Sequence, residues 1–256
     1  MNKKIEDFEK IAFYSWKEHL LRNRSIIVDL MQGQLRSRLK CLECGNESVK
    51  FDSFMFLSVP LPKKRRGQTI SLDDCLAEFS RIEILEGEDM WQCTRCKSPQ
   101  RTEKTIDIWK LPTVLICVVK RFYFSKQKRQ KLVDLVDFPV SKLELTRFVS
   151  SPQKQTPLYD LFGVVNHEGS MSKGHYYAFT KHRNNNQWYY YDDEEVRVIK
   201  DVNLIVSGDA YILFYGRTTE DEIFRQTLGL PSVWPHVIDE DLFDPGKNDS
   251  EVSYNV

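Results

Sequence analysis

The sequence lacks the features that mark a secreted or membrane-inserted chain. No apolar run approaches the roughly 20 residues that are needed to span a bilayer, and residues 1–7 contain no apolar core of a secretory signal. We therefore expect a protein of the cytoplasm or nucleus that does not enter a membrane. In that reducing compartment, paired cysteines bind metal more often than they form disulfides.

Net charge is also absent, because 37 Lys and Arg residues balance 37 Asp and Glu residues. The chain as a whole is therefore not attracted to nucleic acid or to anionic membranes. The distribution is uneven, since residues 218–256 contain nine acidic and two basic residues. We expect this acidic tail to be mobile or to bind a partner. Two basic stretches, residues 63–67 and 120–131, are compatible with nucleic-acid binding, but solvated loops explain them more simply.

A regular alternation of strands and helices is missing as well, and there is no internal repeat. Helical spacing of apolar residues is confined to Ile5–Leu20 and to a short segment that Ser71 caps. Strand patterns occupy much of the remainder: residues 34–40, 51–59, 113–119, 160–166, 175–181, 187–191 and 210–215. The run at 113–119 is apolar throughout and predicts a strand buried on both faces. These patterns predict an α+β fold with a largely antiparallel sheet.

Four of the six cysteines occur as two C-x-x-C pairs. These are Cys41 with Cys44 and Cys93 with Cys96. Two such pairs can together supply four thiolates to one tetrahedral zinc ion. Gly45 can adopt the positive φ that a tight turn after the first pair requires. We therefore predict one structural zinc ion, with strands that bring the two pairs together.

A histidine precedes two aromatic strands that can form a hairpin around residues 182–185. In a hairpin that is symmetric about this gap, His175 faces Asp192 and Tyr177 faces Tyr190. A slip of one residue would bring Asp193 opposite the histidine instead. A carboxylate that accepts from one imidazole nitrogen leaves the other nitrogen free as a base. A purely structural hydrogen bond at a strand end explains the same pattern, so both interpretations stay open.

The candidate base has no obvious nucleophile. Cys117 lies in an apolar strand, where burial raises the pKa of a thiol, and Cys75 follows two aspartates that oppose a thiolate. No serine elbow motif is present. His167 is a second candidate base, but no carboxylate is expected opposite it. Gly174, next to His175, leaves room for a substrate backbone to approach.

Taken together, these segments resemble the ubiquitin-specific proteases. The resemblance spans roughly residues 10–217 and rests on motifs at residues 33–37, 57–62, 119–122, 165–167, 174–178, 188–193 and 210–215. It implies a papain-like fold of thumb, palm and fingers, with a partial protease domain over 1–217. The fingers, which carry the zinc ribbon, are expected at about 34–110 and the palm at about 111–217, followed by the tail at 218–256.

The resemblance also implies an activity, namely hydrolysis of isopeptide or peptide bonds after the C-terminal glycine of ubiquitin. It gives His175 the role of general base and Asp192 that of the residue that orients it. It implies that Asp193 supports the oxyanion or the substrate, and that Gly174 and Tyr176 contact the substrate. The expected partners are ubiquitin and ubiquitinated proteins.

One part of the family pattern is absent from this sequence. The family's nucleophile lies in an Asn-Thr-Cys box in the thumb, and no such box occurs here. Two functions compete: a deubiquitinase whose nucleophile-bearing part is absent from this chain, and a catalytically inactive ubiquitin-binding or scaffold protein. A zinc-ribbon module for nucleic acid would not explain the histidine hairpin.

Overall fold

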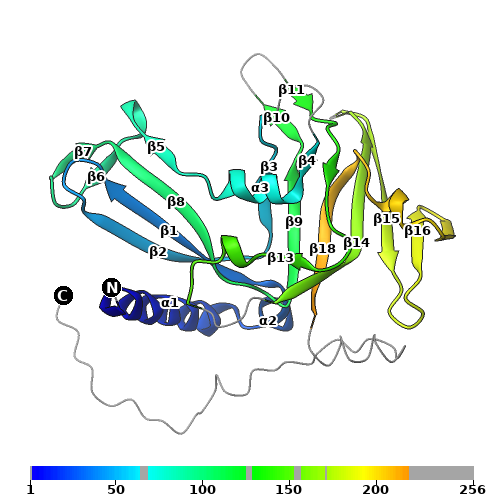
Figure 1. Cartoon of the computed structure of the whole chain (residues 1–256), viewed down its shortest axis with the longest axis horizontal. Coiled ribbons are helices and arrows are strands. Elements are labelled where there is room, and N and C mark those ends of the chain that lie inside the picture. Colours follow the sequence, from blue (N-terminus) through cyan, green and yellow to red (C-terminus); the bar gives the residue numbers. More distant parts are fainter. Residues whose placement is uncertain (1, 64–68, 125–128, 153–156, 171, 219–256) are drawn as a thin grey trace, which may run out of the picture.

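The computed structural model describes residues 2–63, 69–124, 129–152, 157–170 and 172–218. Two sheets dominate it, a four-stranded sheet at the left of Figure 1 and an eight-stranded sheet at the right. The four-stranded sheet has the order β2 (Glu47–Phe54), β1 (Gly33–Cys41), β8 (Thr102–Lys110) and β5 (Glu83–Leu85). All of its neighbouring strands are antiparallel.

The eight-stranded sheet carries most of the core. Its order is β17 (Glu195–Ile199), β16 (Trp188–Asp192), β15 (Gly174–Lys181), β14 (Leu158–Gly169), β18 (Ala210–Thr218), β9 (Val114–Lys120) and β3 (Leu57–Pro60), with β13 (Leu143–Glu144) on β14. Only β3 with β9 runs parallel among the described pairs of this sheet. The predicted α+β class with a largely antiparallel sheet is confirmed.

The long N-terminal helix α1 (Asn2–Asn23) runs along the four-stranded sheet (Figure 1). Ala12 packs there against Phe51 and Trp109, and the Ser15 hydroxyl donates to the Phe51 carbonyl at 2.8 Å. A short helix, α2 (Ile26–Met31), leads from α1 into β1. Among the described helices, none is long and apolar enough to cross a membrane.

Helix α3 (Leu72–Phe79) begins at the predicted cap. Ser71 and Asp74 form a capping box, in which each side chain accepts from the other residue's backbone N–H. The apolar side of α3, with Leu72 and Leu76, joins the main core beside β3. Strand β4 (Ile70–Ser71) precedes it and pairs in parallel with β12 (Val136–Asp137).

Short elements complete the described fold. They are the hairpins β6 (Trp91–Cys93) with β7 (Ser98–Gln100) and β10 (Phe122–Phe124) with β11 (Arg129–Lys131), and the 3-10 helices η1 (Gly87–Asp89), η2 (Thr146–Phe148) and η3 (Val202–Ile205). Both hairpins connect sequential strands in the antiparallel sense.

Two strand predictions were wrong in detail. The single strand expected at 51–59 is divided between the two sheets, because the chain breaks at the exposed Met55 and Phe56. Strand β9 is not buried on both faces, since Ile116 and Val118 are only partly covered. Within residues 34–110, β3 joins the eight-stranded sheet, β4 pairs with β12, and α3 packs in the main core. The acidic tail beyond Thr218 and most of the basic loop at 63–67 lie outside the described residues.

Candidate functional site

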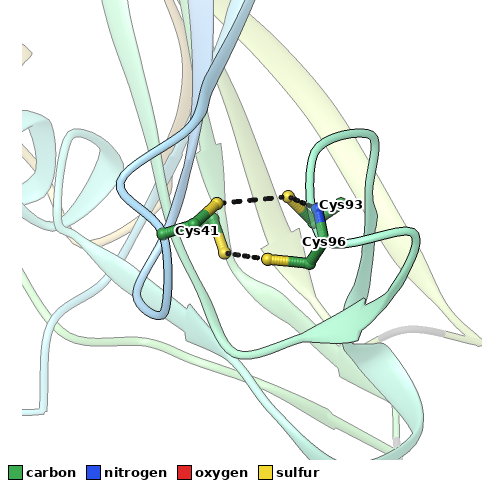
Figure 2. A group of neighbouring side chains, drawn as sticks. Cys41, Cys93 and Cys96 are labelled. Carbon is green, nitrogen blue, oxygen red and sulfur yellow. Dashed lines mark hydrogen bonds between the residues drawn. The ribbon is translucent and has the colours of Figure 1, made fainter.

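The two cysteine pairs meet at one end of the four-stranded sheet. Figure 2 shows Cys41 facing Cys93 and Cys96 across the space between two loops. The Sγ atoms of Cys41 and Cys96 lie 4.0 Å apart, and those of Cys44 and Cys93 lie 3.7 Å apart. All four sulfur atoms are within 4.8 Å of one another. The prediction that strands return the second pair to the first is confirmed.

Each pair lies on the same kind of turn. The N–H of the residue after the second cysteine donates to the carbonyl of the first, from Gly45 to Cys41 at 3.0 Å and from Lys97 to Cys93 at 2.8 Å. Both donor residues have positive φ, 70° at Gly45 and 59° at Lys97. Glycine adopts this conformation freely, but a lysine does so under strain. Lys97 is therefore strained, because the turn that follows Cys96 requires a left-handed backbone conformation at this position.

The donor set fits zinc. With Zn–S bonds of about 2.3 Å, the sulfurs of a tetrahedral site lie roughly 3.8 Å apart, which matches the two distances above. The N–H of Cys96 donates to Cys93 Sγ at 3.5 Å, and this bond is the main reason why the pKa of Cys93 falls to about 6. Such bonds stabilise the thiolate that a metal requires. When bound, zinc would crosslink the loop after β1 to the hairpin β6–β7.

The second group of polar side chains lies at the end of the β15–β16 hairpin. His175 Nε2 is hydrogen-bonded to Asp192 Oδ1, and the Tyr190 hydroxyl donates to Asp192 Oδ2 at 2.5 Å. The carboxylate is thus held on both oxygens, while the His175 side chain stays 42% exposed. The predicted contact between His175 and Asp192 is present. Arg197 lies over the Tyr190 ring, 4.2 Å from its centroid.

The register that led to this contact was nevertheless wrong. Phe179 pairs with Tyr190 and Lys181 with Trp188, two residues away from the predicted pairing. The turn is longer than expected, because His182 and Gln187 close it at 2.8 Å and Asn186 adopts a φ of 55°. A shift of two residues keeps every side chain on its face of the sheet. His175 therefore meets Asp192 as a diagonal neighbour and not as a direct one.

The electrostatics of the group favour a charged carboxylate beside the imidazole. The hydrogen bond with Asp192 raises the pKa of His175 above its usual value. The hydroxyl of Tyr190 and then the His175 ring lower the pKa of Asp192. The same contact with Asp192 raises the pKa of Tyr190 to about 12. Asp192 is therefore ionised at neutral pH and holds the His175 ring through Nε2, which leaves Nδ1 as the nitrogen able to accept a proton.

Tyr190 belongs to this group although it was not among the predicted site residues. The sequence contained the information needed to predict its position, because residues two apart on a strand project from the same face. Tyr190 therefore had to lie beside Asp192 whatever the register of the hairpin.

The remaining predicted site residues surround His175. Asp193 is exposed, has a φ of 47° in the turn to β17, and brings a carboxylate oxygen within 4.8 Å of the donor atoms of His175 and Asp192. Tyr176 is exposed as well. The space beside Gly174 on its side-chain side is occupied by the ring of His167 and is not open to a substrate.

The other two cysteines are buried in the core. Burial raises the pKa of Cys117 to about 12, and Cys75 is fully enclosed on α3. Neither thiol can contact a substrate beside His175. The prediction that both are unsuited to act as nucleophiles agrees with their positions.

Comparison with known proteins gives a consistent result. The family model "Ubiquitin carboxyl-terminal hydrolase" matches residues 1–215. "Ubiquitin carboxyl-terminal hydrolase Usp2" of Drosophila melanogaster is 39% identical over 82% of this chain and 22% of its own length. "Ubiquitin carboxyl-terminal hydrolase 2" of Gallus gallus is 38% identical over 78% of this chain and 55% of its own length. The chain therefore spans between about a fifth and just over half of these two relatives.

Solved structures agree. The SAGA Ubp8/Sgf11/Sus1/Sgf73 DUB module bound to ubiquitin aldehyde includes a chain with a TM-score of 0.66 and 30% identity, over 77% of this chain and 43% of that chain. A yeast SAGA DUB module gives a TM-score of 0.67 at 30% identity, over 78% and 44% of the two chains. The arrangement of sheets described above is thus shared with these chains.

Proposed function

Because this chain belongs to the ubiquitin carboxyl-terminal hydrolase family, we propose that it provides the general base and the ubiquitin-binding surface for hydrolysis of the bond after the C-terminal glycine of ubiquitin. The observation that carries the proposal is the contact of His175 with Asp192, which Tyr190 holds from the other side. Ubiquitin and ubiquitinated proteins are the proposed partners. The similar chain that was solved with ubiquitin aldehyde supports this assignment.

In the proposed reaction His175 is the general base. Asp192 accepts a hydrogen bond from the Nε2–H group and so fixes the tautomer and the orientation of the ring. Nδ1 then takes the proton from a thiol as it attacks the carbonyl carbon of the ubiquitin glycine. Nδ1 later gives this proton to the departing amine. Asp193, whose carboxylate lies within 4.8 Å of the donor atoms of His175 and Asp192, is proposed to act on the substrate or the oxyanion. Tyr176 is the proposed contact for the ubiquitin tail.

The thiol for this reaction is not among the six cysteines of the chain. Four of them form the cluster beside β6 and two lie in the core. We therefore propose that this chain alone binds ubiquitin and holds the base in place without turnover. Loss of a nucleophile typically costs about 10⁶ in rate.

We also propose that the four-cysteine cluster holds one structural zinc ion. Its ligands are Cys41, Cys44, Cys93 and Cys96, and the sulfur spacing supports this assignment. The ion would stabilise the far end of the fingers, which are built on the four-stranded sheet. Elemental analysis of the purified protein should give one zinc per chain, and a metal-free protein would contradict the proposal.

A pair of assays tests the proposed function. The purified chain is incubated with a fluorogenic ubiquitin substrate and a ubiquitin-based thiol probe, and ubiquitin binding is measured separately by titration. Binding without turnover or probe labelling is expected. Turnover that Cys75→Ser or Cys117→Ser abolishes would overturn the assignment of the cysteines.

The comparison of two variants controls for folding. Tyr176→Ala should weaken ubiquitin binding, while His182→Ala, in the exposed hairpin turn away from the site, should leave it unchanged. Absence of ubiquitin binding by the folded wild-type chain would contradict the choice of partner.

A further inference from the structure

A second histidine, His167, lies directly behind the proposed base. It is on β14, is only 5% exposed, and pairs directly with Tyr176 on β15. The neighbouring pair is Glu168 with His175. Because side chains alternate along a strand, His167, Tyr176 and Gly174 belong to one face of this pair of strands and His175 to the other.

The ring of His167 occupies the space that a side chain at Gly174 would need. A Cβ atom built on Gly174 would lie 2.0 Å from His167 Nε2 and 2.6 Å from Cε1. Real Cβ atoms do not approach other heavy atoms this closely, so residue 174 must be glycine while His167 is in place. The same ring also contacts the ring of Tyr176, with 4.7 Å between the ring centroids. A single imidazole thus packs on both residues that flank His175.

His167 is itself held tightly. The backbone N–H of His167 donates to the Asp209 carbonyl at 2.9 Å, and Lys131 Nζ donates to the backbone carbonyl of His167. The ring of Phe122 closes the site at 5.3 Å between centroids. Burial, together with the charge of Lys131, lowers the pKa of His167, so the ring is neutral at neutral pH.

These contacts also argue against His167 as the base. Its Nδ1 is buried and has no hydrogen-bond partner among the described residues. This nitrogen is closed off from solvent and cannot exchange a proton with a substrate. The ring of His167 therefore serves to fill space, and it packs against Gly174 and Tyr176, the two neighbours of His175 in the sequence.

We propose that His167 is a positioning residue: its ring packs on Gly174 and Tyr176 and fixes the backbone on both sides of His175, so that the imidazole of His175 meets Asp192. This inference rests on the proposed role of His175 as the base. It explains in one arrangement why a glycine precedes His175 and why another histidine lies opposite Tyr176, the residue that follows His175.

A double-mutant cycle tests the packing. Gly174→Ala should lower the melting temperature by about 3–10 °C, because a methyl group forced against the His167 ring overpacks the site. In the His167→Ala background the clash with the ring is gone and only the Glu168 carbonyl oxygen, 3.0 Å from the added methyl group, has to give, so the same substitution should cost less. Gly163→Ala is the matched control, since its Cβ would meet Phe214 at an ordinary 3.5 Å. Equal costs of Gly174→Ala with and without His167 would overturn the proposal.

A second readout separates positioning from stability. The titration of His175 is followed by NMR in the folded chain, where the contact with Asp192 raises its pKa. His167→Ala should lose much of this upward shift, and His182→Ala should not. His167→Leu, which restores bulk without nitrogen atoms, should retain the shift and also serves if the alanine variant does not fold. An unchanged His175 titration in His167→Ala, or loss of the shift in His167→Leu, would refute the proposal.

These measurements need no ubiquitin. A chain that fails to bind ubiquitin but shows the coupled titration would contradict the proposed function and leave the positioning role intact.

Discussion

The fully buried Arg121 gives a sharp test of how the eight-stranded sheet is held together. Its Nε donates to the carbonyl of Ala210 at 2.7 Å, and its Nη1 donates to the carbonyls of Leu132 at 3.2 Å and Asp134 at 2.8 Å. One side chain thus joins the end of β9, the start of β18 and the segment after β11. Replacement of Arg121 by methionine keeps most of the volume and removes every donor.

The size of the effect follows from these three bonds. Hydrogen bonds to a charged group are worth about 1.5–3 kcal/mol each, so their loss sets an upper limit of roughly 5–9 kcal/mol. Two effects make the loss of stability smaller than this limit. Methionine removes the cost of a buried charge. It also removes the Nη2 group of Arg121, a buried donor that has no partner among the described residues. We expect a net loss of about 3 kcal/mol, which is roughly 150-fold in the unfolding equilibrium. In a chain of this size that corresponds to a decrease of about 6–12 °C in melting temperature.

Thermal and denaturant unfolding of Arg121→Met measures this loss. Arg101→Met is the matched control, because the Arg101 side chain is 62% exposed and forms a surface ion pair with Glu86 at 3.2 Å. Such pairs contribute about 0–1 kcal/mol. If both variants lose the same small amount, the three carbonyl contacts do not stabilise the sheet and the reasoning fails.

Three further predictions concern the metal, the base and a helix cap. Cys93→Ser should abolish binding of the proposed zinc ion and the hydrogen-exchange protection of the β6–β7 hairpin, because two-stranded hairpins are marginal alone; one zinc per chain in this variant would contradict the ligand set. Asp192→Asn should return the pKa of His175 toward its usual value, measured by NMR. Because folding raises the pKa of His175, the free energy of unfolding that this contact contributes is fully present below the usual histidine pKa. It declines as the pH rises through the pKa of His175 in the folded chain. A contribution that is lost only on acidification would contradict this sign. Ser71→Ala should cost about 1 kcal/mol of unfolding free energy, and loss of less than a few tenths would argue against the capping box.

Local chemistry made part of this structure predictable. The capping box at Ser71 and Asp74 depends only on residues three apart, and the prediction was confirmed. The convergence of the two C-x-x-C pairs was also predictable, because a shared ion requires it. The shared face of His175 and Asp192 on the hairpin was also predictable. Side chains alternate between the two faces of a strand, so a shift of two residues leaves each side chain on its original face.

Other features depend on distant parts of the chain. The hairpin register followed from the true length of the turn, in which Asn186 takes a left-handed conformation that no local pattern required. The break at Met55 and Phe56 arises because β2 and β3 pair with different sheets. The burial of Arg121 could not be read from its neighbours, because its three acceptors come from segments 11 to 89 residues away.

The position of β18 has a consequence for how the protein is made. This strand lies between β14 and β9, yet it follows both of them in the sequence. On the ribosome, β9 and β14 must each wait with an unpaired edge until residues 210–218 have left the exit tunnel. At roughly 5–20 residues per second, the delay from the end of β9 to the end of β18 is on the order of 5–20 s. During that interval the nascent chain presents unpaired strand edges, which are templates for pairing with other chains.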